Sequence, residues 1–194
     1  VSVGSLLLMV ALNRAESTAA GLYYLVHSTV AAALMFLLAG LVIAQRGKAE
    51  DRFVQARPVT QPVLLGGLFF IAALALIGMP PLSGFIGKAL MLKAALPDAA
   101  GWIWPPLLLG SLAALLMLSR AGSTLFWRVR GENDEPVRVQ PGQQLALWIL
   151  VLTLVALVVW AGWLTTYMQQ AAADMLTGLD LQQLLAPAGG YDAE

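Results

Sequence analysis

The stretch "GMPPLSGFIGKALM", residues Gly78–Met91, decides the fold, because it places two adjacent prolines, three glycines and a lysine inside a long apolar segment. Pro80 and Pro81 have no backbone N–H to donate. The carbonyls one helical turn earlier, near Leu76 and Ile77, therefore lose their helical partners. Irregular backbone at membrane depth is tolerated only where it is buried in protein or lines a water-filled cavity. The stretch predicts a helix that is broken within a membrane.

The composition indicates a protein of the lipid bilayer. Of the 194 residues, 59% are hydrophobic and 11% are charged, whereas soluble domains carry about 25% charged residues. The absence of cysteine excludes disulfides and thiolate metal sites, and the single histidine, His27, has no acidic neighbours in sequence with which to hold a metal. We expect an all-α membrane protein, a bundle of transmembrane helices with one discontinuous helix, and we expect no cofactor, no metal and no nucleic-acid partner.

The apolar windows predict a transmembrane domain over residues 1–168, with a partial first span followed by four complete spans. Because the chain starts with Val1 inside an apolar run, either its start codon is unusual or it is the C-terminal part of a longer protein, and we favour the second interpretation. Residues 169–194 are predicted to be an extracytoplasmic tail with an interfacial helix, whose apolar face carries Met175, Leu176, Leu179, Leu184 and Leu185. The predicted spans are 1–12, 19–44, 62–96 with its break at 79–83, 103–127 and 142–167.

The basic residues predict the orientation. Cytoplasmic loops carry an excess of lysine and arginine. Only Arg14 lies in a loop on one side of the predicted membrane. The loops on the other side carry Arg46, Lys48, Arg52, Arg57, Arg128, Arg130 and Arg138. These two loops are therefore predicted to be cytoplasmic, and the C-terminus extracytoplasmic.

Lys88 lies well inside the broken span, and an ionisable group at this depth is a candidate for function. The acidic residues all lie in loops or the tail, so Lys88 is predicted to be neutral, hydrated or paired with another chain. Ser83 is predicted to cap the second half-helix, which restarts near Gly84. Burial and the positive end of that half-helix disfavour the ammonium form, which favours a role as a proton-relay element. A proline kink that only shapes packing is the alternative.

His27 is the second candidate for the relay, because an unperturbed histidine titrates near neutral pH. Tyr24 and Ser28 lie next to it in sequence and are candidates for a hydrogen-bonded water chain. The alternative is a neutral histidine at a helix packing interface, which the alanines at 31–33 favour. Two further basic residues lie within spans: Lys93, near the outer end, either snorkels or continues the proton path, and Arg120 either reaches water or lines a cytoplasmic inlet.

Two stretches, "YYLVHSTVAAALMFLLAGLV" at 23–42 and "LFFIAALALIGMPPLSGFIGKALML" at 68–92, resemble the antiporter-like membrane subunits shared by Mrp-type multisubunit Na+/H+ antiporters and respiratory complex I. The motif "GMPPLSGFIGK" looks most like the D subunit of the Mrp family. The resemblance implies a fold of about fourteen helices built around two inverted five-helix repeats. It also implies that Lys88 is the lysine of an outer half-channel and His27 the histidine of a central axis.

This chain departs from the family pattern in two ways. The first repeat, with its glutamate and lysine pair, is absent, so the resemblance covers only the last third or so of a full subunit. Some relatives also carry a second basic group one turn after the histidine, where this chain has Ala31.

We predict a transport protein rather than an enzyme: a proton-translocating subunit of a multisubunit monovalent cation/proton antiporter in the bacterial inner (plasma) membrane. Protons would pass between His27 and Lys88 through water. The expected partners are the other membrane subunits of the antiporter complex, the lipid bilayer, protons and Na+. One alternative is a proton-pumping subunit of NADH:quinone oxidoreductase or of a membrane-bound hydrogenase. A second alternative is a structural fragment that does not conduct.

Overall fold

The computed structural model describes residues 2–46, 58–96, 99–129 and 138–178, and its elements are all helical. The chain is therefore an all-α membrane protein, as predicted. Its elements are α1 (Ser2–Ala11), α2 (Ala15–Gln45), α3 (Pro62–Ile77), α4 (Ser83–Ala94), α5 (Ala100–Gly122) with the π-helix η2 (Ser123–Trp127), α6 (Pro141–Val159) and α7 (Ala161–Gly178).

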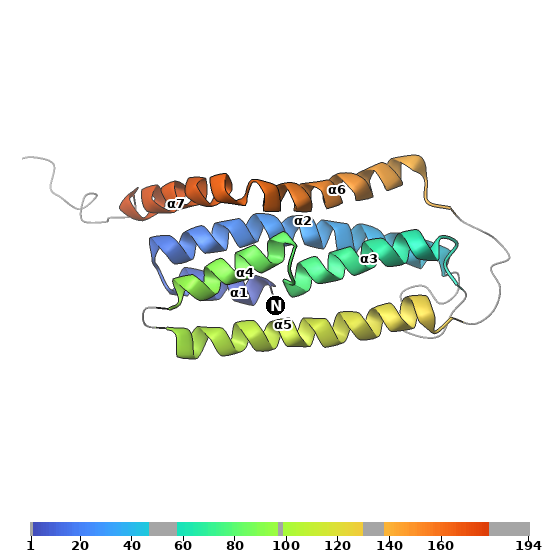
Figure 1. Cartoon of the computed structure of the whole chain (residues 1–194), viewed down its shortest axis with the longest axis horizontal. Coiled ribbons are helices and arrows are strands. Elements are labelled where there is room, and N and C mark those ends of the chain that lie inside the picture. Colours follow the sequence, from blue (N-terminus) through green and yellow to red (C-terminus); the bar gives the residue numbers. More distant parts are fainter. Residues whose placement is uncertain (1, 47–57, 97–98, 130–137, 179–194) are drawn as a thin grey trace, which may run out of the picture.

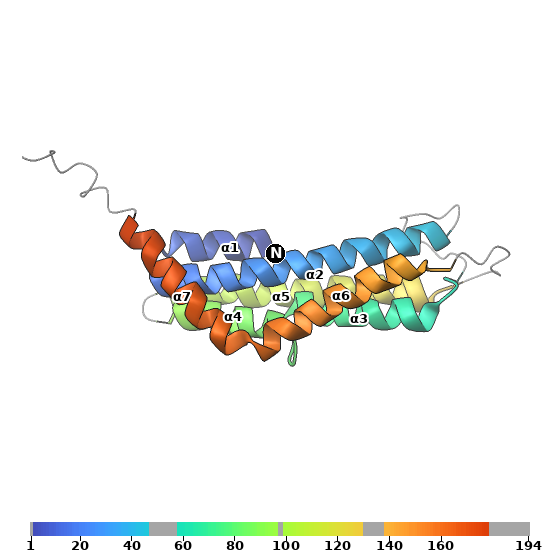
Figure 2. The same cartoon turned by 90° about the horizontal axis from the view of Figure 1, so that it is seen from above.

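The helices run along one common long axis (Figure 1). Helices α3 and α4 lie end to end between α2 and α5, with the break near the middle of the bundle. Helices α6 and α7 cover the other side of α2 and meet at an angle, which Figure 2 shows most clearly. Helix α1 lies beside one half of α2 only, so the N-terminus sits near mid-bundle.

The helix lengths suit a bilayer. Three described segments are long and apolar enough to cross a membrane: α2, α5 with η2, and α6. Helices α3 and α4 have 16 and 12 residues, and placed end to end they extend about 42 Å, more than the hydrocarbon thickness of about 30 Å. Large apolar side chains are exposed on several helices, with Phe36 of α2 at 79% and Trp102 of α5 at 87%. An outward apolar surface of this kind suits a protein of the bilayer.

The break is predicted at 79–83; in the structure α3 ends at Ile77 and α4 begins at Ser83, so the interruption covers residues 78–82. The predicted span 142–167 instead consists of two helices, because α6 ends at Val159 and α7 begins at Ala161. Gly162 follows directly, and glycine is about 1 kcal/mol less favourable than alanine in a helix.

Helix α7 continues through Gly178, so the first ten residues of the predicted tail, 169–178, extend this helix. The rest of that tail, including Leu179, Leu184 and Leu185, lies outside the described residues.

One end of the bundle, which we call the loop end, holds the C-terminus of α2, the N-terminus of α3, the end of η2 and the N-terminus of α6 (Figure 1). Backbone N–H groups bind side-chain amides here: Thr60 donates to Gln45 Oε1 at 2.9 Å, and Val139 donates to Gln61 Oε1 at 3.1 Å. Both basic loops therefore start from the same end, as the predicted orientation requires. Of their basic residues, Lys48, Arg52, Arg57 and Arg130 lie outside the described residues.

Two apolar clusters form the core, one on each side of the break. Toward the loop end, α2, α3 and α6 pack through residues such as Leu38, Leu65 and Leu147. Toward the opposite end, α1, α2, α4 and α5 pack through residues such as Met9 and Met91. The buried polar groups that we describe next lie between these two clusters.

Candidate functional site

The two prolines remove the helical donors of two carbonyls in the last turn of α3. In an unbroken helix, the carbonyls of Leu76 and Ile77 would accept from the N–H groups four residues later, and those residues are Pro80 and Pro81. Both carbonyls accept instead from the Lys88 amine, with Nζ at 3.3 Å and 2.6 Å respectively. The predicted release of these carbonyls is confirmed, and a side chain occupies them.

The Lys88 amine has a third acceptor on α5. Its Nζ donates to Ser111 Oγ at 2.7 Å, and the Ser111 hydroxyl donates its own hydrogen to the Leu107 carbonyl at 2.9 Å. An ammonium has three donors, and all three are matched although the side chain is only 8% exposed. The sequence predicts three alternatives for Lys88: a neutral amine, a hydrated amine, or an amine paired with another chain. It does not predict the observed arrangement, in which acceptors of its own chain bind the amine.

Gly78 provides the room through which the Lys88 side chain passes. It has φ +83°, and a Cβ there would lie 2.7 Å from Lys88 Cδ. Its N–H and that of Met79 both donate to the Leu74 carbonyl, at 3.0 and 3.1 Å. The Met79 N–H, which would bind the Ala75 carbonyl in a regular helix, is thus directed elsewhere. This leaves the Ala75 carbonyl free for another donor.

That donor is His27, which is buried on α2. The Ala75 backbone hydrogen-bonds the imidazole, and His27 Nδ1 lies 2.8 Å from Ser83 Oγ. A Cβ on Gly84 would collide with the Ala75 oxygen and lie 2.8 Å from His27 Nε2, so these two atoms meet over Gly84. Because a carbonyl only accepts, Nε2 carries the hydrogen, and in the neutral ring Nδ1 accepts from the Ser83 hydroxyl.

Ser83 does not cap α4, so that prediction is wrong. The N-cap position is Leu82, which makes no side-chain capping bond, and Ser83 is the first residue of the helix. Its hydroxyl points to His27 rather than to the N–H groups of its own helix. The Ser83 hydroxyl, which the local sequence pattern predicts to cap α4, hydrogen-bonds His27 of α2 instead.

The site as a whole is built on the C-terminus of α3. A helix leaves its last carbonyls without intrahelical partners. Here the Ala75 carbonyl binds His27, and the next two carbonyls bind Lys88. The negative end of a helix dipole favours cations, and both side chains become cations on gaining a proton. Two groups able to bind a proton thus share one buried helix end.

The other residues predicted to line a path near His27 make different contacts. The Tyr24 hydroxyl lies 3.4 Å from Ser2 Oγ, and the Tyr24 ring centroid is 5.7 Å from that of His27. The Ser28 hydroxyl donates to the Leu25 carbonyl of its own helix at 3.2 Å. Both residues are buried beside the imidazole, and the partners of their hydroxyls are elsewhere.

Lys93 and Arg120 are both exposed. Lys93 lines a cavity near the end opposite the loops, together with Glu16. Arg120 follows Ser111 on α5 by nine residues, about 13 Å along the helix toward the loop end. The structure therefore joins His27 and Lys88 in one site and leaves these two basic residues outside it.

Sequence reasoning did not identify Ser111 as a partner of Lys88, nor the close approach of Ala75 and His27 that requires a glycine at position 84. A serine in the middle of an otherwise apolar span, in "LLLGSLAALL" at 107–116, is the signal that indicates Ser111. The sequence places Gly84 in the helix break, whereas in the structure it is the point where α3 and the imidazole of α2 approach α4. Across the described part of the chain, no cluster of three or more metal-ligating His, Cys, Asp or Glu side chains is present.

Comparison with known proteins places this site in context. The family model described as "NADH:quinone oxidoreductase/Mrp antiporter, TM" matches residues 2–117. The D subunit of the Na(+)/H(+) antiporter of Bacillus subtilis is 32% identical, over 90% of this chain and 36% of the relative. The D subunit of a probable K(+)/H(+) antiporter of Rhizobium meliloti is 33% identical, over 98% of this chain and 41% of the relative. The chain thus spans about two fifths or less of the length of these curated relatives.

Proposed function

Because the chain belongs to the NADH:quinone oxidoreductase/Mrp antiporter transmembrane family, we propose that it is a proton-translocating membrane subunit of a multisubunit monovalent cation/proton antiporter. The two relatives named above are the D subunits of a Na(+)/H(+) antiporter and of a probable K(+)/H(+) antiporter. They support an exchange of protons for Na+ or K+ by a complex in which this chain works with other membrane subunits.

One observation carries the proposal: His27 and Lys88 bind three consecutive carbonyls at the broken end of α3. His27 binds that of Ala75, and Lys88 binds those of Leu76 and Ile77. The structure offers partners to both protonation states of each group. If His27 Nδ1 gains a proton, it donates to the Ser83 oxygen, whose own hydrogen turns away. If Lys88 loses a proton, the amine keeps two donors for three acceptors. Each group can therefore change its proton count without a large rearrangement, which a relay requires.

The orientation follows from the two basic loops. The helix ends that flank them lie together at the loop end (Figure 1), and lysine and arginine favour the cytoplasmic side. We therefore assign the loop end to the cytoplasm of a bacterial inner membrane and the end of α7 to the outside. Protons would enter from the loop end, meet His27 and Lys88 at the break, and leave at the opposite end.

The family description also includes subunits of NADH:quinone oxidoreductase, in which the same relay would be driven by redox chemistry. The names of the relatives favour the antiporter, since both are antiporter subunits. A non-conducting structural role is the remaining alternative. It predicts that His27 and Lys88 tolerate replacement as long as the complex assembles.

The test uses the assembled antiporter complex in membrane vesicles, with Na+- or K+-driven proton movement followed by a pH-sensitive dye. We expect Lys88→Ala and His27→Ala each to slow exchange at least about 100-fold, the usual contribution of a positioned proton-transfer group. Lys88→Arg keeps the charge but cannot deprotonate, and should be equally inactive. Immunoblots of the purified complex must show normal assembly. A wild-type exchange rate in Lys88→Ala would contradict the proposed relay and favour the structural alternative.

A further inference from the structure

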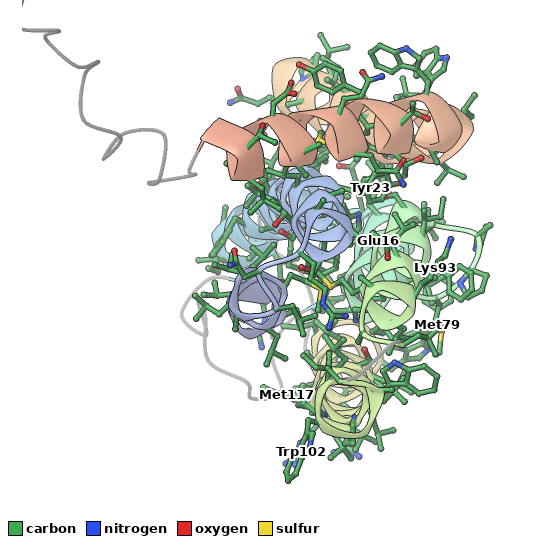
Figure 3. The ribbon with its side chains drawn as sticks, turned by 90° about the vertical axis from the view of Figure 1, so that its left-hand side faces the viewer. Glu16, Tyr23, Met79, Lys93, Trp102 and Met117 are labelled. Atoms are coloured by element: carbon green, nitrogen blue, oxygen red, sulfur yellow. The ribbon has the colours of Figure 1, made fainter. Side chains whose placement is uncertain are left out.

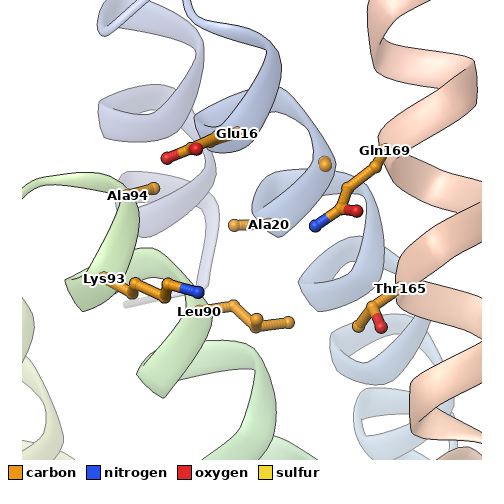
Figure 4. A pocket seen from close by; sticks show the side chains of 8 residues that line it. Glu16, Ala20, Leu90, Lys93, Ala94, Thr165 and Gln169 are labelled. Atoms are coloured by element: carbon orange, nitrogen blue, oxygen red, sulfur yellow. The ribbon is translucent and has the colours of Figure 1, made fainter.

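A small cavity with four polar and four apolar lining residues lies near the end of the bundle opposite the loops, between α2, α4 and α7. Its volume is about 60 Å³. Figure 3 looks onto this end of the molecule and places Glu16 and Lys93 next to each other, and Figure 4 shows side chains from the three helices converging on the cavity. The lining residues are Glu16, Ala19, Ala20, Leu90, Lys93, Ala94, Thr165 and Gln169.

The polar lining suits water and protons. It contains a carboxylate, an ammonium, a hydroxyl and an amide, of which the last two, Thr165 and Gln169, come from α7. The Thr165 hydroxyl donates to the Gly162 carbonyl at 2.9 Å, so its oxygen can still accept. The cavity is large enough to hold water. The Lys93 ammonium beside the Glu16 carboxylate disfavours a metal cation, which would have a single carboxylate to bind.

The cavity lies on the same face of α2 as His27. Glu16, Ala20, Tyr24 and His27 follow one another at spacings of four, four and three residues, which places them along one stripe of a helix. Helix α4 also passes both the histidine and the cavity: Ser83 binds His27, and Leu90 lines the cavity. These two α4 residues are about 10 Å apart along the helix. The cavity is thus the next polar space outward from the histidine.

Two buried tyrosines separate His27 from the cavity. Both rings pack against Gly87, where a Cβ would lie 2.9 Å from Tyr24 Cδ2 and 3.5 Å from Tyr23 Cδ1. The Tyr23 hydroxyl donates to the Leu157 carbonyl of α6 at 2.9 Å, which anchors that ring close to the junction of α6 and α7. A proton that leaves His27 outward therefore has to pass this pair.

We propose that the cavity is the outer proton-exchange site of the relay, with Glu16 as the group that receives the proton. This inference rests on the proposed function. When the rings of Tyr23 and Tyr24 move aside, water carries a proton from the His27 imidazolium to the Glu16 carboxylate, leaving a neutral imidazole and a neutral carboxyl. The carboxyl then releases the proton to the outer water and becomes a carboxylate again. Among the described residues, Lys93 is the charged group that lines the cavity with Glu16, while α7 presents uncharged Thr165 and Gln169. Arg14 lies two residues before Glu16 in the sequence.

The first experiment measures exchange by the assembled complex in vesicles. Glu16→Gln removes the proton acceptor and keeps the shape, and we expect exchange to slow about tenfold. The chain also offers a matched pair of neighbours: Gln169 and Gln170 are both exposed, and of the two Gln169 lines the cavity. Gln169→Leu should slow exchange several-fold, whereas Gln170→Leu should leave it unchanged.

The second experiment measures access directly and does not depend on activity. The chain has no cysteine, so Thr165→Cys introduces a single thiol into the cavity. A charged, membrane-impermeant thiol reagent should label this variant from the outer side and not from the cytoplasmic side. This labelling still tests the outer site if the complex that carries Glu16→Gln fails to assemble.

The outcomes separate this inference from the relay itself. Wild-type exchange in Glu16→Gln, equal rates in Gln169→Leu and Gln170→Leu, or labelling of Thr165→Cys only from the cytoplasmic side or from neither side would each overturn the outer site. If His27→Ala and Lys88→Ala are inactive in the same assay, the proposed function still stands. If those two variants exchange normally, both proposals fall together.

Discussion

Gly84→Ala tests the architecture of the site most directly, because it adds one methyl group where three helices meet. The added Cβ would collide with the Ala75 carbonyl and lie 2.8 Å from His27 Nε2. Neither neighbour can retreat cheaply, since the carbonyl belongs to the end of α3 and the ring is held by Ser83. The substitution therefore acts on the hydrogen bond that joins the imidazole to the broken helix.

The expected magnitude follows from three opposing effects. Overpacking a well-filled site costs about 1–3 kcal/mol, and contact with backbone places this case at the upper end. Loss of the bond between His27 and Ala75 adds about 1 kcal/mol. Alanine is about 1 kcal/mol more favourable than glycine within a helix, which offsets part of the cost. We expect a net destabilisation of about 2–3 kcal/mol. Exchange should also be slower, because the hydrogen bond that joins His27 to Ala75 is lost.

Two other glycines provide a graded control. Gly67 on α3 has open space around it, so Gly67→Ala should be neutral or slightly stabilising. A Cβ added to Gly87 would lie 2.9 Å from the Tyr24 ring. A ring can shift, so Gly87→Ala should give an intermediate loss. The three variants share one chemical change and differ only in what the methyl group meets.

The assay is cation-driven proton movement in vesicles that contain the assembled complex, paired with the Tm of the detergent-solubilised complex. We expect the order Gly67→Ala, Gly87→Ala, Gly84→Ala in increasing loss of both quantities. Normal exchange and normal Tm in Gly84→Ala would refute the contact between α3, α4 and His27 on which the site depends.

Two further predictions concern the hydroxyl groups of the site. Ser83→Ala removes the partner of His27 and should slow exchange about five- to tenfold, whereas Ser28→Ala should stay within about twofold, because that hydroxyl binds a carbonyl of its own helix; exchange rates of the two variants in parallel decide this. Ser111→Ala removes one of three acceptors from the buried Lys88 amine and should slow exchange by about ten- to 100-fold, since a hydrogen bond to a charged group contributes about 1.5–3 kcal/mol. Equal rates in wild type and Ser111→Ala would show that the third acceptor is dispensable.

Local chemistry explains why the sequence revealed the break. Pro80 and Pro81 cannot donate, and this fact alone identifies Leu76 and Ile77 as the residues with free carbonyls. In the structure α3 ends at Ile77, and the carbonyls of Leu76 and Ile77 accept from the Lys88 amine. The apolar composition likewise sufficed for the all-α membrane fold, because a bilayer accepts few alternatives to helices.

The junction of α6 and α7 shows the limit of that reasoning. The apolar pattern runs through Trp160 without a proline, so it predicts one continuous span. The chain bends there instead, and α7 continues at an angle toward the end opposite the loops, where it packs against α2 (Figure 2). Which of two apolar arrangements forms depends on packing partners that lie far away in sequence.

The sequence by itself determined the class of the protein, the position of the helix break, the two candidate proton carriers and the grouping of the basic loops. Each of these follows from the residues themselves or from a neighbour within one helical turn. Only the tertiary structure decided the partners of those carriers: Ser111 for Lys88, and Ala75 and Ser83 for His27. These partners come from other helices, and no local pattern records which helix end, hydroxyl or glycine will lie opposite a buried side chain once the bundle has packed.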